Sequence, residues 1–162
     1  MIHLIVGNTG SGKTTYANQL KNKNRGIIFS IDKWNNTLFM PDKKEDDALE
    51  WFLERIERSE TLILNLVLQL EESGVDAILD LGLSKQEHRE KFRDFAKVND
   101  FACTLHFLDV PKEIRWHRVL ERNTTKGETY EFDVTEENFE FMENWFEKPT
   151  EQELENGIII ND

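Results

Sequence analysis

A glycine-rich stretch near the start of the chain holds the residues with the clearest chemical use. It fits the pattern G-x-x-x-x-G-K-[ST] at every position, through Gly7, Asn8, Thr9, Gly10, Ser11, Gly12, Lys13 and Thr14. Glycines let successive backbone N–H groups turn toward one hollow that is the size of a phosphate group. We expect these residues and Thr15 to bind a nucleoside triphosphate, with Lys13 on the β- and γ-phosphates and the Thr14 hydroxyl on Mg²⁺.

The sequence around this stretch argues against a chance glycine turn. The apolar run IHLIV at residues 2–6 precedes it, and a helical segment at residues 12–20 follows it. A phosphate-binding loop requires a strand, a glycine loop and a helix in this order, because the N-terminus of the helix adds positive potential.

An acidic residue ends another apolar run, AILD at residues 77–80. Asp80 can hold Mg²⁺ directly or through a water molecule. The next residue is Leu81, where many ATP-hydrolysing proteins carry a glutamate that activates water, and the chain has no Asn-Lys-x-Asp motif to recognise guanine. These two features favour ATP as the donor and a hydroxyl, rather than water, as the acceptor of its phosphoryl group.

A second acidic residue follows the run IIFSI at residues 27–31. Asp32 would lie at the sheet edge that faces the γ-phosphate, where a carboxylate can accept the proton of an attacking hydroxyl. Alternatively, Asp32 could cap a helix that begins at Lys33 or Trp34. By strand alternation Ser30 points the same way as Asp32 and can contact Mg²⁺ or a phosphate.

Arginines for the transferred phosphate are expected after the fourth strand. Arg115, Arg118 and Arg122 are spaced i, i+3, i+7 and share one helix face. They can contact ATP phosphates as a short lid, residues 123–130, closes over the site. Pairing with carboxylates such as Glu121 is the alternative, and we expect it for one of the three, with Arg118 and Arg122 as the phosphate ligands.

The acceptor of the phosphoryl group is expected beyond Asp32, beside residues 34–58. Trp34 and Trp51 could form an aromatic wall there, although core packing is the better explanation for each Trp taken alone. The sequence also offers charged residues to hold the acceptor, and it leaves open the sign of its charge. The candidates are Arg55, Arg58, Arg89 and Arg93 for an anionic acceptor, or Glu54 and Glu57 for a cationic one.

The whole chain alternates between strand-like and helical segments. Short apolar runs predict five strands, at residues 2–6, 27–31, 76–81, 103–109 and 157–160. Helices are predicted between them, at residues 12–20, 46–73, 84–98, 111–122 and 135–146. This order predicts an α/β fold with a five-stranded, mainly parallel sheet and helices on both of its faces.

Local signals predict where several helices begin and end. The segment 46–73 is expected as two helices that break near Ser59, with Gly74 as the C-terminal stop. Ser84 opens the capping-box sequence SKQE, Pro111 suits the first position of the next helix, and Thr135 can cap the last one.

Composition sets the class of the protein. A chain of 162 residues with eleven Phe and four Trp suits one domain, residues 1–162, with a small helical lid at about residues 115–130. The net charge of −12 disfavours a long nucleic acid as a partner, and no apolar run could span a membrane. A single cysteine, and histidines without ligand spacing, indicate neither a disulfide nor a Cys/His metal site. We expect a cytoplasmic protein.

Taken together, these motifs resemble a known family. The glycine loop, FSIDKW at residues 29–34, LDLG at residues 79–82 and FLDVPKEIRWHRVLERN at residues 107–123 look like the small P-loop kinases. That group includes phage polynucleotide kinase, gluconate kinase, chloramphenicol phosphotransferase and the zeta toxins. The similarity is greatest to uncharacterised bacterial zeta-toxin-like (AAA-type) ATP-binding proteins, which share the late F-x-F helix and an acidic tail.

The resemblance implies roles for individual residues. Asp32 matches the general base of the family, Lys13 and Thr14 its phosphate and Mg²⁺ ligands, and Arg118 and Arg122 its lid arginines. The sequence thus predicts ATP- and Mg²⁺-dependent phosphoryl transfer to a hydroxyl of a small molecule. Two alternatives stay open: an ATP-binding switch or toxin–antitoxin component with a protein partner and no fast chemistry, and a slow ATPase.

Overall fold

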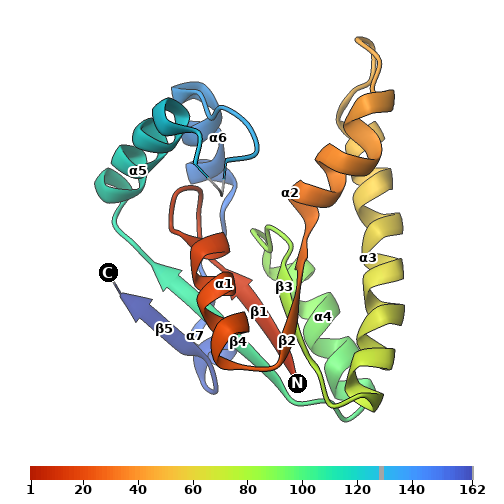
Figure 1. Cartoon of the computed structure of the whole chain (residues 1–162). Helices are drawn as coiled ribbons and strands as arrows, with labels where there is room; N and C mark the ends of the chain where they lie inside the picture. The colour runs from red at the N-terminus through yellow and green to blue at the C-terminus, as the bar shows by residue number, and fades with distance from the viewer. Residues whose placement is uncertain (128–129, 162) are drawn as a thin grey trace.

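The computed structural model describes residues 1–127 and 130–161, and five strands form its centre (Figure 1). These strands are β1 (Ile2–Val6), β2 (Gly26–Ser30), β3 (Asp76–Asp80), β4 (Cys103–Asp109) and β5 (Ile158–Asn161). They lie in the order β2-β3-β1-β4-β5, and every pairing is parallel. The predicted five-stranded α/β sheet is confirmed, with strand ends within one residue of those expected.

Helices connect the strands and cover the sheet. They are α1 (Lys13–Lys23), α2 (Ile31–Trp34), α3 (Leu49–Glu72), α4 (Gln86–Val98), α5 (Lys112–Thr125), α6 (Glu136–Trp145) and α7 (Glu151–Leu154). Two short turns extend α2, a π-helical turn η1 (Asn35–Phe39) and a 3₁₀ turn η2 (Met40–Asp42). Over the described residues, no helix combines the length and apolar character that crossing a membrane demands.

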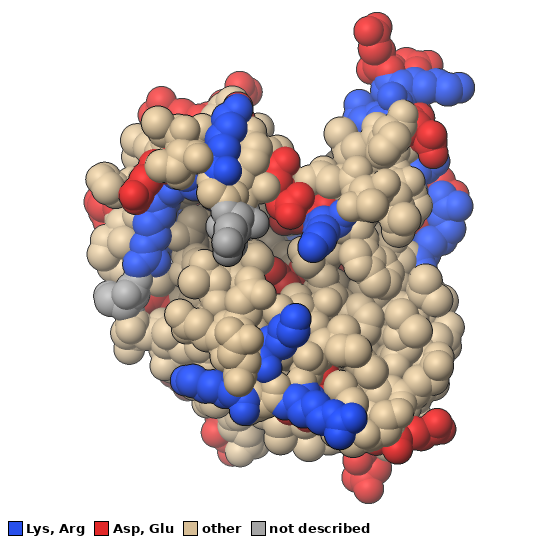
Figure 2. Space-filling model, in the orientation of Figure 1, with Lys and Arg blue, Asp and Glu red and all other residues tan. Residues whose placement is uncertain are grey.

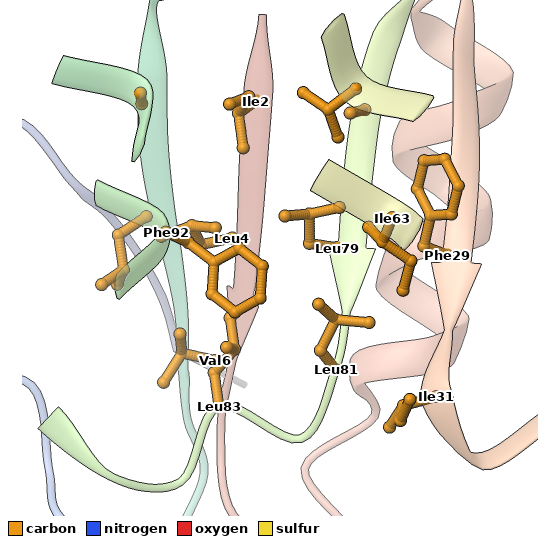
Figure 3. Packing of buried hydrophobic residues seen from close by; sticks show 14 of the residues in the cluster. Ile2, Leu4, Val6, Phe29, Ile31, Ile63, Leu79, Leu81, Leu83 and Phe92 are labelled. Carbon is orange, nitrogen blue, oxygen red and sulfur yellow. The ribbon is translucent and has the colours of Figure 1, made fainter. Parts of the chain in front are cut away.

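The central strand β1 is buried on both sides, as its unbroken apolar run predicts. On one face, Leu4 packs with Ile63 of α3 and Phe92 of α4 in the larger core cluster (Figure 3). On the opposite face, Ile5 packs with Ala17 of α1 in a second cluster. Because successive side chains of a strand point to opposite faces, one strand anchors helices on both sides of the sheet.

Two parts of the chain rise above the carboxyl ends of the strands (Figure 1). We call residues 31–60 the arm, since α2, η1, η2 and the first half of α3 project together. We call residues 112–127 and 130–145 the lobe, which contains α5 and α6. The space-filling view shows a hollow between arm and lobe, with acidic atoms on its wall (Figure 2). The glycine loop between β1 and α1 lies at the base of this region.

The predicted break near Ser59 is wrong, because α3 runs without interruption from Leu49 to Glu72. Ser59 and its neighbour Glu60 are both buried within this helix. The Glu60 carboxylate is stabilised by His88 Nε2 at 2.5 Å and Lys91 Nζ at 2.7 Å, both from α4. These partners neutralise its charge, so a polar pair in the middle of the helix does not interrupt it. The predicted stop is confirmed, since Gly74 has φ +64° and Val75 N–H donates to Leu70 O.

The caps of the later helices follow the sequence only in part. The predicted capping box at Ser84 does not form, and α4 begins at Gln86 after the N-cap Lys85. The Gln86 N–H instead donates to a carboxylate oxygen of Glu147 at 2.8 Å, a partner supplied by tertiary structure. The cap at Thr135 is confirmed, because its hydroxyl accepts the Asn138 N–H.

Candidate active site

The glycine loop has the backbone conformation that its sequence predicts. Gly10 and Gly12 have φ of +79° and +90°, a region that side chains with a Cβ rarely adopt. A Cβ on Gly10 would also lie 2.5 Å from the Arg115 carbonyl oxygen. Lys13 Nζ crosses the loop and donates to the carbonyl oxygens of Gly7 at 2.9 Å and Asn8 at 3.3 Å. These bonds hold the ammonium group over the hollow of the loop.

Two residues of the lobe, Arg115 and Glu143, form hydrogen bonds to the glycine loop. The Arg115 guanidinium contacts both carboxylate oxygens of Glu143, at 2.5 and 2.9 Å, and donates to the Thr9 carbonyl at 3.2 Å. Glu143 in turn accepts a hydrogen bond from Asn8 Nδ2 at 2.5 Å. Arg115 therefore forms the kind of ion pair that the sequence led us to expect for one of the three arginines, with Glu143 as its partner. Sequence reasoning missed Glu143, which lies 28 residues from Arg115.

Thr14 and Asp80 meet at the edge of the sheet. The Thr14 Oγ1 hydroxyl donates to Asp80 Oδ2 at 2.8 Å, and Asp80 is buried. One hydroxyl and one carboxylate suit Mg²⁺, which takes few protein ligands and completes its octahedron with waters and substrate phosphates. Within residues 1–127 and 130–161, no cluster of three or more His, Cys, Asp or Glu side chains could hold a metal by itself. These residues therefore fit an ion that arrives with a nucleotide.

Ser30 pairs in register with Asp80 at the end of the neighbouring strand. Its hydroxyl caps α2 by accepting the Lys33 N–H at 3.5 Å. Asp32 is therefore not the helix cap, and it belongs to the first turn of α2 rather than to the strand. The expectation that strand alternation aligns Ser30 with Asp32 is wrong, because β2 ends at Ser30.

Asp32 lies on the wall of the cavity above the glycine loop. Its side chain still reaches solvent, yet the surrounding protein removes much of its water. This desolvation, with repulsion from Asp80, raises the pKa of the Asp32 carboxyl, while Lys13 opposes the shift. Desolvation likewise lowers the pKa of Lys13, against the attraction of Asp80 and Asp32. Opposite shifts on neighbouring groups are typical of catalytic sites.

The cavity measures about 590 Å³, which is in the usual range for a small-molecule site. The predicted ligands Lys13, Thr14, Asp32 and Asp80 line it, as do Arg118 and Arg122 of α5. The Arg122 Nε is buried and has no hydrogen-bond partner among the described residues. The structure thus brings together the predicted phosphate ligands, both carboxylates and two of the three arginines.

The acceptor residues predicted on the arm do not line this cavity. Trp34 packs against the core, edge-on to the Phe29 ring at 6.0 Å. Arg55 lies over the Trp51 ring at 3.7 Å and donates to the Trp51 carbonyl, so these two residues satisfy each other. Arg58 is exposed and pairs with Glu54 at 3.5 Å. Packing and surface pairing explain these side chains.

Arg89 and Arg93 of α4 also lie away from the cavity. Arg89 is fully buried, binds both carboxylate oxygens of Glu153, and donates to the carbonyls of Leu83 and Glu147. These bonds use four of its five N–H donors inside the core, so Arg89 is structural. Arg93 lines a separate cavity between α4 and the segment of α7. The predicted acceptor-binding pair is therefore not supported.

Sequence reasoning missed an apolar wall that the lobe contributes to the cavity. Phe132, Val134, Phe141 and Met142 line it, together with Asn138. The F-x-F spacing in the late helix was the one available signal, because it places Phe139 in the core and Phe141 at the surface.

Solved structures show what this fold is similar to. The APS kinase CysC from Mycobacterium tuberculosis, in complex with AMPPNP and APS, is 16% identical with a TM-score of 0.63, over 99% of this chain and 87% of that one. Kti12 from Chaetomium thermophilum, in complex with ADP-AlF3, is 16% identical with a TM-score of 0.70, over 99% and 89%. A sugar kinase from Janibacter sp. is 17% identical with a TM-score of 0.63, over 99% and 84%. The chain therefore has the α/β fold of P-loop kinases.

The sequence comparisons place the chain in a family. None of the curated proteins matches it. The AAA_33 family model, described as AAA domain, matches residues 2–149. That match covers most of the 162 residues, and the chain belongs to this family of AAA domains.

Proposed function

We propose that the protein transfers the γ-phosphoryl group of ATP to a hydroxyl of a small molecule, in the presence of Mg²⁺. One observation carries the proposal: the phosphate-binding loop and the carboxylate of Asp32 line the same cavity. Phosphoryl transfer needs little beyond positioning and charge neutralisation, so a loop, a carboxylate and cations in one cavity suffice. The fold shared with kinases supports this proposal.

The donor half of the site would hold the triphosphate. The glycine loop and Lys13 would contact the β- and γ-phosphates, while Arg118 and Arg122 would approach from the lobe. Thr14 and Asp80 would hold Mg²⁺, which neutralises phosphate charge when it is bound with ATP. The unpartnered Nε of Arg122 would gain an oxygen acceptor on binding.

Asp32 would act as the general base toward the acceptor hydroxyl. A raised pKa makes its carboxylate a stronger proton acceptor than an ordinary aspartate. Proton transfer from the acceptor oxygen to Asp32 accompanies formation of the new O–P bond, as the bond between the γ-phosphorus and the leaving oxygen of ADP breaks. Lys13 and the arginines balance the charge of the transferred group.

Water is a poorer acceptor in this site than a bound hydroxyl compound. Leu81 follows Asp80 and is buried, so this position offers no carboxylate to activate water. Slow release of phosphate without an acceptor remains compatible with the same donor half. The ratio of transfer to hydrolysis is therefore the quantity that defines the function.

A metabolite extract provides the direct test. The protein is incubated with Mg-ATP and the extract, and mass spectrometry searches for compounds that gain one phosphoryl group. Lys13→Ala serves as the inactive control, because it removes the ammonium that holds the phosphates. We expect at least one phosphorylated product that needs Lys13. Phosphate release without any such product would instead identify the protein as an ATPase.

A further inference from the structure

We infer that the acceptor is a hydroxyl compound without negative charge that carries a flat apolar group, which lies against Phe132, Phe141 and Met142. This inference rests on the proposed function, since it names the acceptor class of the same site. It follows from three features of the cavity: where this apolar wall stands, how exposed it is, and which charges surround it.

One end of the apolar wall, at Phe141, lies beside the loop that follows β3. This loop is on the same side of the glycine loop as Asp32. The Glu147 N–H, just after α6, donates to the Ser84 carbonyl at 2.8 Å. Phe141 stacks on Trp145 with ring centres 5.8 Å apart, and Lys85 Nζ lies 4.2 Å from the centre of the Trp145 ring. The loop after β3 therefore positions Phe141 through Trp145. Ser84 of this loop lines the cavity together with Phe141. Asp32 and this wall line the same cavity.

The second side of the wall is tied to the arm. Asn36 Nδ2 donates to Glu131 Oε2 at 2.9 Å, across 95 residues of sequence. Glu131 directly precedes Phe132, so this bond links the wall to the segment that carries Asp32. This bond joins the arm to the lobe.

The aromatic side chains of the wall are exposed to an unusual degree. Phe132 is 49% exposed and Phe141 is 60% exposed, yet both line the cavity. Neighbouring exposed aromatics in a cavity mark a ligand surface, because their contact with water is unfavourable. Flat apolar groups stack against such rings better than polyols do.

The charges on this side of the cavity disfavour an anion. The described cations that line the cavity are Lys13, Arg118 and Arg122, which belong to the glycine loop and α5. Around the aromatic wall the polar lining consists of Asp32, Ser84 and Asn138, with Glu131 close by. A phosphate or carboxylate on the acceptor would meet the acidic Asp32 and Glu131, and Lys85, a cation beside the wall, is already paired with Glu147 at 3.0 Å.

Three probe compounds test separately whether an apolar ring favours binding and whether a negative charge disfavours it. They are 3-phenyl-1,2-propanediol, which has the ring and no charge, 1,2-propanediol, which lacks the ring, and 3-phenyllactate, which has a carboxylate in place of the terminal CH₂OH group. Binding is measured by saturation-transfer NMR titration with Mg-AMPPNP bound, on the wild type, Phe141→Ala and Leu62→Ala. Leu62 is a matched control, since it is 52% exposed on α3 and is not part of the cavity lining.

We expect phenylpropanediol to bind at least about tenfold more tightly than either other probe, and Phe141→Ala to remove that preference. Leu62→Ala should bind like the wild type. Equal or tighter binding of phenyllactate, or an unchanged preference in Phe141→Ala, would overturn the inference. Preferred transfer to phosphate- or carboxylate-bearing compounds of the extract would also overturn it and would leave the proposed function standing. Selective binding of phenylpropanediol without transfer to any compound would support the acceptor class and contradict the proposed function.

Discussion

Arg115 binds both carboxylate oxygens of Glu143, and each of the two residues also contacts the glycine loop. Arg115 is 6% exposed, so its charge depends on this partner. The pair joins α5 to α6 and positions the loop through Thr9 and Asn8. The lobe therefore supports the glycine loop through this pair, and it also contributes Arg118 and Arg122 to the lining of the cavity.

Loss of the Glu143 charge should weaken both the fold and the loop. We expect Glu143→Gln to lower the free energy of unfolding by about 2 kcal/mol, because a buried guanidinium loses its counter-charge. Urea unfolding measures this change, and ATP affinity should fall with it. Glu140→Gln on the same helix removes an exposed pair with Lys112 and should cost much less stability. Equal losses in the two variants would contradict a supporting role for Glu143.

A buried network of side chains should make stability depend on pH. His106 is 2% exposed; one ring nitrogen lies 3.0 Å from His3 Nδ1, and the other lies 2.9 Å from the Tyr16 hydroxyl. His3 Nε2 lies 3.1 Å from Asp76 Oδ2. Desolvation, with repulsion from His3, lowers the pKa of His106 to about 4. The folded protein therefore keeps this ring neutral over a range in which the unfolded chain protonates it.

The sign of the pH effect follows from proton uptake. Between pH 6.5 and 4 the unfolded chain binds more protons at His106, so acidification should lower stability by up to about 1.4 kcal/mol per pH unit from this group. Unfolding is measured between pH 7 and 5, because most carboxyl groups titrate below this range and add little to the slope. His106→Gln should flatten the slope, whereas His117→Gln, at an exposed position, should not. A steep slope retained in His106→Gln would assign the pH dependence to other groups.

Arg122 should matter for turnover more than for folding. Its Nε has no partner among the described residues, so removal of the guanidinium breaks no bond of that atom in the unliganded protein. We expect Arg122→Gln to lower kcat about 10²-fold or more, through lost stabilisation of the transferred phosphoryl group. Arg58→Gln, on the exposed face of the arm, should retain wild-type kcat. Similar kcat values for wild type and Arg122→Gln would remove Arg122 from the phosphate site.

The sheet and the donor half of the site could be predicted because local sequence determines them. Apolar runs define buried strands, and the glycines at positions 10 and 12 require φ values that few other residues adopt. Asp80 and Thr14 follow from these elements, since parallel strands end at the same edge of the sheet. Asp32 was expected directly after a strand, whereas it lies in the first turn of α2. It still lines the cavity, because β2 ends at that edge of the sheet.

The remaining features depend on contacts between distant residues. Arg89 was a candidate for binding the acceptor, but it is buried and forms a bidentate ion pair with Glu153, 64 residues later. Glu60 lies inside an unbroken helix because α4 supplies its counter-charges. Phe141 lines the cavity because Glu147 docks the end of α6 on the loop after β3. No local pattern encodes these pairings, so the acceptor side was the least predictable part of the site.

The most direct test of the proposed chemistry is the rate of phosphoryl transfer in Asp32→Asn, measured with the acceptor that the extract identifies. We expect transfer to fall by at least about 10²-fold because the proton acceptor is lost, while ATP affinity stays close to that of the wild type. Asp42→Asn, an exposed aspartate on the same arm, is the matched control and should transfer normally. Transfer by Asp32→Asn at the wild-type rate would contradict the assignment of Asp32 as the base.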